Sequence, residues 1–311
     1  MKAKGKFRPW KKSEITVFLM SICGIIFLII FAYVPMFGVA LAFKDGDRRL
    51  NILEVLLYGE NVGFKNFEIF FTDWNFKDLI TNTLGLNLLM LLINFPAPII
   101  FALLLNEVIH TPYKKFVQAV TVFPNFVSWM VFGGIVLSMI DMSTGIFNPL
   151  LEAIGLSDPN DPINLGEAQY YWGTIIITSL VKGTGWGSII YFAAIAGVPT
   201  EMYEAARIDG ANRWQKITRI TLPSIAPTIT VFFLLSVSGL LNNSFEHLYV
   251  FQNVINISKS EVLATYVYKQ GVVNQRYSYT TAIGLFQSVV AIILLSVSNV
   301  ISKRVAGRGL F

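Results

Sequence analysis

The chain has 311 residues, of which 54% are hydrophobic and only 14% are charged, and its net charge is +5. This composition excludes a soluble globular protein and indicates a membrane protein. The positive charge is explained by membrane topology, as shown below, so it gives no reason to expect nucleic acid as a partner.

Long apolar runs predict six transmembrane helices. Five uncharged runs cover 15–43, 79–106, 116–140, 220–245 and 277–302, and a sixth, about 172–197, is interrupted only by Lys182. Each exceeds the roughly 20 residues that a spanning helix needs. Backbone groups in lipid must be satisfied within the segment, and the alternation typical of barrel strands is missing. We therefore expect an all-α membrane protein.

The basic residues predict the orientation of these spans. With both termini in the cytoplasm, the tail 1–14, two inner loops and the tail 303–311 carry most of the lysine and arginine, whereas the segment 141–171 carries only acidic charges. An excess of basic residues marks the cytoplasmic side. The first run is too long for a secretory signal and lacks an A-x-A-like site, so we interpret it as an uncleaved helix. It holds the single cysteine, Cys23, which excludes an intramolecular disulfide.

The chain divides into a first helix at 15–43, an extracellular segment at 44–78 and five further helices within 79–302. The segment 44–78 is rich in phenylalanine, which is compatible either with a helix lying on the membrane surface or with packing over the ends of the helix bundle. Pro96, Pro98 and Pro124 predict kinks in the second and third spans. Asn87 and Asn94 in the second span are expected to form hydrogen bonds between helices.

A polar loop at 197–224 separates the fourth and fifth spans. Pro199 suits the start of a helix, Gly210 permits the left-handed geometry that ends one, and Pro223 is expected to end the second helix before the fifth span begins. The loop is therefore predicted to be a helix–turn–helix that projects from the membrane. The alternative interpretation is an ordinary amphipathic cytoplasmic hairpin that no partner contacts.

The loop carries the spacing E-A-A-x3-G-x9-I-x-L-P from Glu204 to Pro223, and this pattern resembles the coupling loop of permease subunits in binding-protein-dependent type I ABC importers. In that family the loop sits in a groove on an ATPase. The resemblance implies a second permease subunit, a cytoplasmic ATPase dimer that holds ATP and Mg, and an extracellular solute-binding lipoprotein as partners. The implied contact residues are Glu204, Ala205, Ala206, Gly210, Leu222 and Pro223 from the pattern, with Arg207, Asp209, Ala211 and Arg213 as neighbours.

Looser motifs resemble the sugar-importer branch, in particular permeases of the LplB type assigned to oligosaccharide or polysaccharide uptake. They are P-N-F-V-S-W at 124–129, G-W-G-S-I-I-Y at 185–191 and F-E-H at 245–247. The resemblance thus implies a sugar as solute and the bacterial plasma membrane as location. An importer of the same architecture for amino acids, peptides or phosphate stays open, and so does a self-contained secondary transporter.

Polar and aromatic residues in the spans are candidates for the substrate path. A charge inside a membrane helix normally faces protein or water, and amide, carboxylate and aromatic side chains suit saccharide hydroxyls and rings. The candidates are Lys182, Trp186, Tyr191, Asn242, Asn243, Glu246 and His247. Alternatively, Lys182 pairs with a carboxylate or carbonyl of a neighbouring helix, the aromatics face lipid, and the polar residues at the outer end of helix five lie among headgroups.

Catalytic signatures are missing from the sequence. The glycine-rich stretch 183–188 does not fit G-x4-G-K-[ST], so the chain is not expected to bind ATP itself. Its two histidines, His110 and His247, lie far apart and lack cysteine partners, so we predict neither a metal site nor an enzyme.

Overall fold

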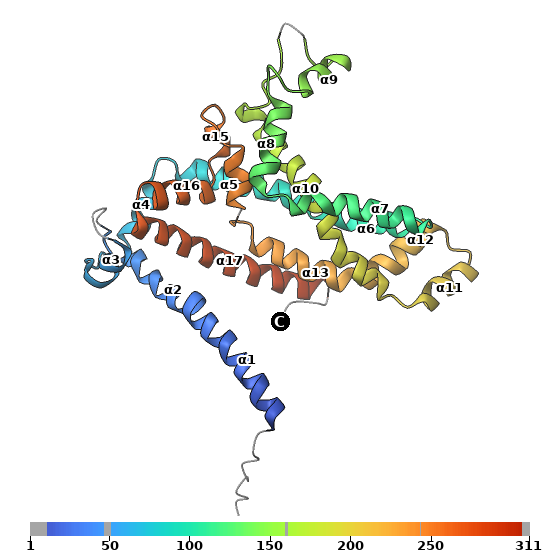
Figure 1. Ribbon diagram of the computed structural model, residues 1–311, viewed down its shortest axis with the longest axis horizontal. Coiled ribbons are helices and arrows are strands. Elements are labelled where there is room, and N and C mark those ends of the chain that lie inside the picture. Colours follow the sequence, from blue (N-terminus) through green and yellow to red (C-terminus); the bar gives the residue numbers. More distant parts are fainter. Residues whose placement is uncertain (1–10, 47–50, 159–160, 243, 307–311) are drawn as a thin grey trace, which may run out of the picture. The chain divides into compact units, whose positions relative to one another are not determined.

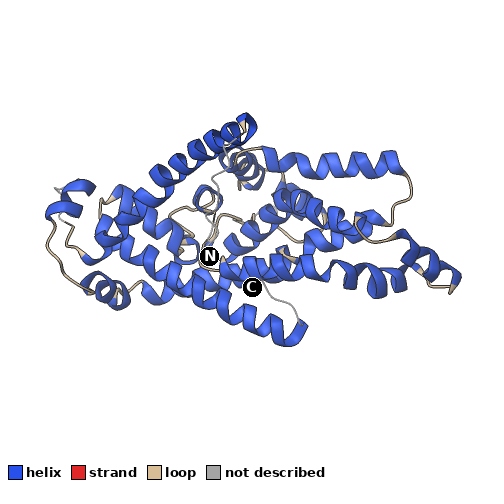
Figure 2. Ribbon diagram, turned by 90° about the horizontal axis from the view of Figure 1, so that it is seen from below, coloured by secondary structure: helices blue, strands red, loops and turns tan. Residues whose placement is uncertain are grey.

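The computed structural model describes residues 11–46, 51–158, 161–242 and 244–306. Its elements within these ranges are all helices (Figure 2). The described chain holds five helices that are long and apolar enough to span a membrane, and a sixth span if one strongly bent pair is counted. The predicted all-α membrane architecture is therefore confirmed.

The chain divides into two compact units, of which the first comprises residues 1–72 and 270–285. It contains the first span, the short helices that follow the span, and the beginning of the last helix (Figure 1). They are α1 (Lys12–Leu28), a π-helical turn (Ile29–Tyr33), α2 (Val34–Met36), a 3-10 helix (Phe37–Phe43), α3 (Ile52–Tyr58), α4 (Lys65–Thr72) and the start of α17 (Tyr277–Ala306).

Aromatic packing organises the first unit around α4. The rings of Phe64 and Phe67 lie 5.5 and 5.7 Å from that of Phe43, and the fully buried Phe70 lies 6.5 Å from the ring of Tyr279. The amide of Asn66 donates to the carbonyl oxygens of Ala42 and Lys44. The phenylalanine-rich segment therefore forms ordered helices in this unit.

The second unit, residues 73–269 and 286–311, contains the other spans. Its central helix is α10 (Ala168–Ala196), which packs against α5, α6, α7 and α13. The remaining helices are α5 (Phe76–Asn94), α6 (Pro96–Asn106), α7 (Thr111–Val122), a 3-10 turn (Phe123–Phe126), α8 (Trp129–Ile140), α9 (Phe147–Ala153), α11 (Thr200–Ile208), α12 (Arg213–Lys216), a π-helical turn (Ile217–Thr221), α13 (Leu222–Ser238), α14 (Phe245–Val250), α15 (Ile257–Ser260) and α16 (Leu263–Tyr268).

The helices are interrupted at Pro96 and Pro124, as the sequence predicts, whereas α6 continues through Pro98. In the second span α5 ends at Asn94 and α6 begins at Pro96. In the third span the break is larger than a kink, because Thr111–Phe126 and Trp129–Ile140 meet at 100°. Pro124 lies in the 3-10 turn, Val127 is extended, and the Ser128 hydroxyl caps α8 by accepting from the Val131 N–H. The prediction of one continuous helix over 116–140 was therefore wrong.

The fifth span ends earlier than predicted, at Ser238 instead of 245. Gly239 ends the helix, and two amides of neighbouring helices then bind carbonyl oxygens that no longer have helical partners. Asn87 donates to the Leu240 oxygen at 2.7 Å, and Gln287 donates to the Leu241 oxygen at 3.2 Å. The predicted role of Asn87 in bonding between helices is thus confirmed.

Three short helices, α14 to α16, follow this break before the last span, and side chains of α5 and α10 hold them. Asn82 donates to the carbonyl oxygens of Ser258 and Glu261, and the buried Tyr171 hydroxyl donates to that of Leu248 at 2.9 Å. The excursion is therefore a fixed part of the second unit.

Candidate functional site

The loop at 197–224, named the coupling segment after its resemblance, forms the predicted helix–turn–helix. α11 ends at Ile208, and Gly210 adopts φ +74°, which favours glycine. Asn212 and Gln215 then form a reciprocal capping box at 2.8 Å that starts α12. The turn is therefore fixed at both ends by local sequence.

Pro223 does not end the second helix, contrary to expectation. α12 continues through the π-helical turn Ile217–Thr221 into α13, so that 213–238 forms one helical span. Proline normally clashes with the carbonyl four residues earlier, and the wider turn directly before Pro223 relieves this clash. The coupling segment is thus continuous with the fifth span.

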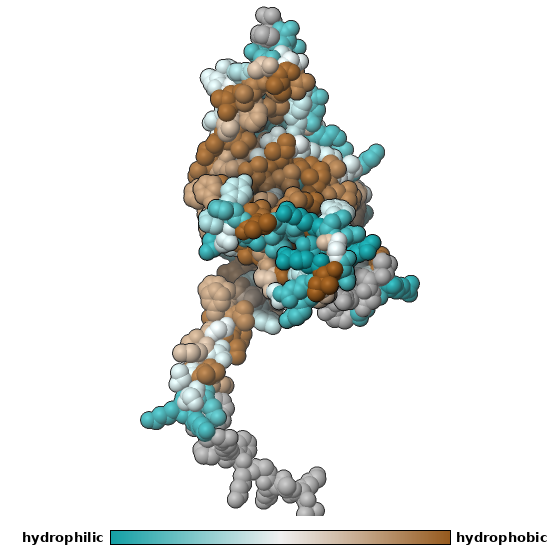
Figure 3. Space-filling model, turned by 90° about the vertical axis from the view of Figure 1, so that its right-hand side faces the viewer, coloured by the Kyte–Doolittle hydropathy of each residue, from teal (hydrophilic) through white to brown (hydrophobic). Residues whose placement is uncertain are grey.

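Most residues of the pattern face outward. Glu204, Ala205, Gly210 and Pro223 are exposed, and Ala206 and Leu222 are half-buried. The neighbours Arg207, Asp209 and Arg213 are exposed, and Ala211 is half-buried. Figure 3 views this end of the second unit, where hydrophilic surface gathers over α11 and α12. Two large apolar side chains flank the turn within this polar surface: Ile208 is 87% exposed and Trp214 is 71% exposed.

The base of the segment is fastened to the apolar core of the second unit. The Tyr203 hydroxyl and the Thr221 hydroxyl lie 2.9 Å apart, which joins α11 to the start of the fifth span. Ile217 is buried in a cluster with residues of α6 and α10, including Tyr191. A force on the exposed turn would therefore reach the helices α6, α10 and α13 through close packing.

Lys182 lies inside α10 and is only 5% exposed. Its ammonium donates to the carbonyl oxygen of Val127, at the bend of the third span, and lies 4.5 Å from the ring centroid of Trp129. This arrangement corresponds to a structural pair with a carbonyl. The cation holds the break between the 3-10 turn and α8, where the extended Val127 cannot use its carbonyl in a helix.

His247 completes a polar and aromatic cluster around Lys182. Its ring stacks on that of Trp129, with centroids 3.7 Å apart and an interplanar angle of 16°. Its Nε2 lies 2.9 Å from the hydroxyl of Thr178, one helical turn before Lys182 on α10. α8, α10 and α14 are therefore joined at one point.

Two other predicted polar residues, Asn242 and Glu246, are not buried in the cluster around Lys182 and His247. Because the fifth span ends at Ser238, Asn242 lies in the connection to α14 and Glu246 lies at the start of α14, not at a helix end as predicted. Asn242 and Glu246 are exposed, and Asn243 lies outside the described residues. Glu246 precedes the buried His247 on α14.

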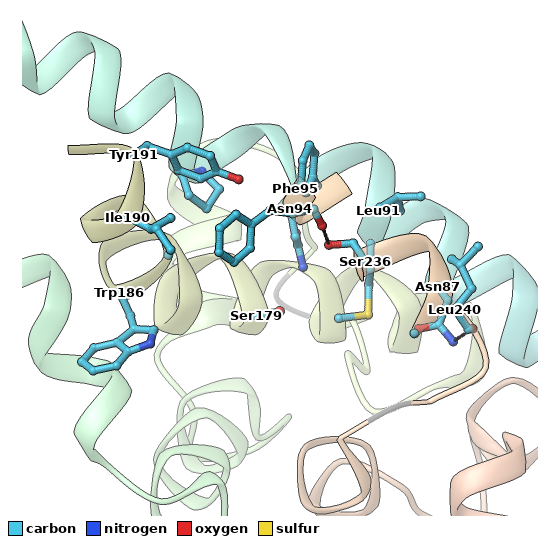
Figure 4. A pocket seen from close by; sticks show the side chains of 15 residues that line it. Asn87, Leu91, Asn94, Phe95, Ser179, Trp186, Ile190, Tyr191, Ser236 and Leu240 are labelled. Carbon is cyan, nitrogen blue, oxygen red and sulfur yellow. Dashed lines mark hydrogen bonds between the residues drawn. The ribbon is translucent and has the colours of Figure 1, made fainter. Parts of the chain in front are cut away.

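A cavity of about 490 Å³ opens between α5, α6, α10 and α13 (Figure 4). Trp186, which is 51% exposed, and the buried Tyr191 line it, so two of the predicted path residues meet here. Lys182 is not among the described residues that line this cavity. The remaining wall is mostly apolar and includes the amides Asn87 and Asn94 and the hydroxyls of Ser179 and Ser236.

Sequence reasoning missed the polar wall of this cavity. Asn94 was expected to bond between helices, but neither its amide nitrogen nor its oxygen has a hydrogen-bond partner in the described structure. Ser179 and Ser236 gave no signal, because single serines are ordinary in membrane helices. The spacing of Ser179 and Trp186, seven residues apart on one helix face, could have indicated a shared wall.

Close packing brings α10 to the third span beside this cavity. A β-carbon at Gly185 would meet backbone atoms of Thr121 and Val122, whereas one at Gly187 would touch the Pro98 ring at 3.0 Å. Nothing lies within 4 Å of the position at Gly183. Two of these three glycines, Gly185 and Gly187, therefore allow a close approach between helices.

Comparison with known proteins agrees with this architecture. Residues 94–307 match the family described as binding-protein-dependent transport system inner membrane component. The chain is 41% identical to protein LplB of Bacillus subtilis over 99% of this chain and 95% of that protein. It is 37% identical to the polygalacturonan/rhamnogalacturonan transport system permease protein YteP of Bacillus subtilis, over 95% and 90% of the two chains.

The fold also matches a solved structure. A chain of a bacterial ABC transporter involved in the import of the acidic polysaccharide alginate superposes with a TM-score of 0.84 at 35% identity, covering 94% of this chain and 97% of that chain. A chain of an alginate ABC transporter in complex with an alginate pentasaccharide-bound periplasmic protein gives the same score and identity over 96% and 98%. The chain therefore belongs to the inner membrane component family of binding-protein-dependent transport systems, as a multi-pass, non-catalytic permease subunit of a bacterial ABC importer.

Proposed function

We propose that this permease carries an oligosaccharide across the cytoplasmic membrane and that its coupling segment, 197–224, passes the closure of an ATPase dimer to the spans. The ATPase, which holds ATP and Mg, would bind the exposed turn around Gly210. A second permease subunit would complete the pathway, and an extracellular solute-binding lipoprotein would deliver the sugar. Both termini would then lie in the cytoplasm with the coupling segment, as the basic residues favour.

One observation supports the coupling proposal above all: the exposed turn of the coupling segment is continuous with buried residues where the segment meets the spans. Ile208 and Trp214 give the turn two exposed apolar side chains, which suit a partner surface better than water. At the base, Tyr203 and Ile217 connect the segment to the core cluster. That cluster includes Tyr191, which also lines the cavity, so one packed path leads from the turn to the cavity wall.

Support for an oligosaccharide comes from two directions. The similar proteins named above serve the transport of polygalacturonan, rhamnogalacturonan and alginate. The cavity combines amides, hydroxyls and a half-exposed indole in a mostly apolar wall, which is the usual composition of a site for a polar ligand with apolar faces. Amides offer a donor and an acceptor side by side, as neighbouring sugar hydroxyls require.

Coupling is tested with Glu204→Lys and Gly210→Pro in the complex with its ATPase, second permease and binding protein, reconstituted in liposomes. We expect ATP-dependent uptake to fall at least tenfold while the permease stays folded. Lys115→Glu, a charge reversal at an exposed position of α7, is the matched control and should keep uptake. Unchanged uptake in both coupling variants would contradict the proposal. Uptake that persists without ATP under an ion gradient would indicate a secondary transporter.

The solute is tested with a defined panel: oligogalacturonide, alginate oligosaccharide, arabino-oligosaccharide and, as non-sugar competitors, a peptide and an amino acid. The wild-type complex should import at least one saccharide of this panel, and the non-sugar solutes should not compete for its binding protein. Import of a peptide or amino acid in preference to all saccharides would overturn the sugar assignment and leave the coupling proposal standing.

A further inference from the structure

The Asn94 amide is the one side-chain amide in the described structure whose nitrogen and oxygen are both buried without a hydrogen-bond partner. It ends α5, directly before the break at Phe95 and Pro96, and it lines the cavity. Leaving a buried donor or acceptor unpaired costs about 1–3 kcal/mol, so such groups are rare in folded proteins. The position therefore calls for a partner that binds from the cavity.

Asn87 shows that the fold can satisfy an amide at this helix. It lies on the same helix, two turns earlier, and lines the same cavity, yet its nitrogen donates to the Leu240 oxygen at 2.7 Å. That bond holds the break at the end of the fifth span. Two asparagines of one helix thus differ in role: the Asn87 amide donates a hydrogen bond within the protein, and the Asn94 amide stays available to a ligand.

The surroundings of Asn94 fit a sugar. In Figure 4 its amide points into the space that Ser179 on α10 and Ser236 on α13 also border. The Ser236 hydroxyl donates to the Phe232 carbonyl at 2.8 Å, which leaves its oxygen lone pairs as acceptors. The Trp186 indole at the same cavity is half-exposed and offers an apolar face for a pyranose ring.

A trapped water is the simplest competing partner. Buried waters typically make about three hydrogen bonds to polar groups that lack other partners. A water would satisfy the amide without contributing to transport, and the cavity of about 490 Å³ is within the range of ligand sites, far above the space for one water. If a water is the partner, loss of the amide should leave uptake unchanged. If a sugar is the partner, loss of the amide should lower uptake.

We propose that Asn94 is a specificity-determining residue of the translocation path, whose amide donates to one hydroxyl of the passing oligosaccharide and accepts from its neighbour. Ser236 adds an acceptor, and Trp186 contacts the ring face. This inference rests on the proposed function, since it concerns the substrate of that same pathway.

The test compares Asn94→Leu with Asn87→Leu in the reconstituted complex, using the panel saccharide that the wild type imports. Asn94→Leu should keep the thermal unfolding midpoint at or above the wild-type value, because it removes unpaired polar atoms, while uptake falls about tenfold. Stimulation of ATP hydrolysis by the loaded binding protein should stay within twofold, because the coupling segment is untouched. Asn87→Leu should lower the midpoint, because the Leu240 oxygen loses its donor.

Uptake by folded Asn94→Leu within twofold of wild type would overturn the inference in favour of a trapped water. A wild-type complex that imports none of the panel saccharides would instead refute the proposed function. If Asn94→Leu fails to assemble, a second measurement decides. Cys23 is the only cysteine, so Asn94→Cys in a Cys23→Ser background can be labelled with a charged thiol reagent. The imported saccharide, with ATP and binding protein, should slow labelling at least fivefold; an unchanged rate would refute the inference.

Discussion

The approach of α10 to the third span gives a quantitative prediction for Gly185→Ala. A β-carbon at this position would lie 2.7 Å from the backbone nitrogen of Val122 and closer still to the carbonyl oxygen of Thr121. Backbone atoms cannot move aside as a flexible side chain can, so the helices must separate. We expect the substitution to destabilise the second unit even though it adds a single methyl group.

The magnitude follows from two opposing effects. Alanine in place of glycine stabilises a helix interior by about 0.5–1 kcal/mol. Overpacking a close contact costs about 1–3 kcal/mol, and a clash with backbone lies at the upper end of this range. Gly183→Ala experiences only the first effect, since nothing lies within 4 Å of its β-carbon position. Both variants on this helix gain the alanine term, so they should differ in the free energy of unfolding by the overpacking cost alone, about 2–3 kcal/mol.

The assay is thermal unfolding of the detergent-solubilised permease followed by fluorescence-detected size exclusion. At about 2–4 °C per kcal/mol, the midpoint of Gly185→Ala should lie about 4–12 °C below that of Gly183→Ala. Gly183→Ala should match or slightly exceed the wild type. Equal midpoints for the two variants would refute the reasoning, because they would mean that the third span does not approach α10 at Gly185.

Three further predictions concern single interactions. Lys182→Met should change the free energy of unfolding by less than about 2 kcal/mol. The variant loses the hydrogen bond to the Val127 oxygen, but it no longer buries a charge, which costs about 2.5–3.5 kcal/mol. A drop in the thermal midpoint that corresponds to much more than about 2 kcal/mol would contradict this balance. Gly210→Ala should strain the turn by about 1–2 kcal/mol at φ +74° and weaken ATPase co-purification, whereas Gly210→Asn should have a smaller effect. Equal recovery of the ATPase with the wild type and both variants would contradict this prediction. Tyr171→Phe should lower the thermal midpoint, since the buried Leu248 oxygen loses its donor at a cost of about 1–3 kcal/mol; an unchanged midpoint would show that the bond adds nothing.

The interruptions of the helices show where sequence reasoning succeeds and where it stops. Proline has local effects, so the break between Asn94 and Pro96 was predictable. The size of the bend at Pro124 was not, because the extended Val127 depends on a donor from Lys182, 55 residues later in the chain. Likewise, the end of the fifth span at Ser238 depends on Asn87 and its bond to the Leu240 oxygen.

The sequence by itself determined the class of the protein. The length and low polarity of the apolar runs specify membrane helices, because backbone groups in lipid must be hydrogen-bonded within the segment. Gly210 specifies the turn between α11 and α12 through its local geometry. Only the tertiary structure decided which polar residues remain available to a solute. Asn87 and Asn94 are the same residue type on one helix, and Lys182 is as polar as a path residue could be. Their roles differ because hydrogen bonds to distant carbonyls occupy Asn87 and Lys182 and leave Asn94 facing the cavity.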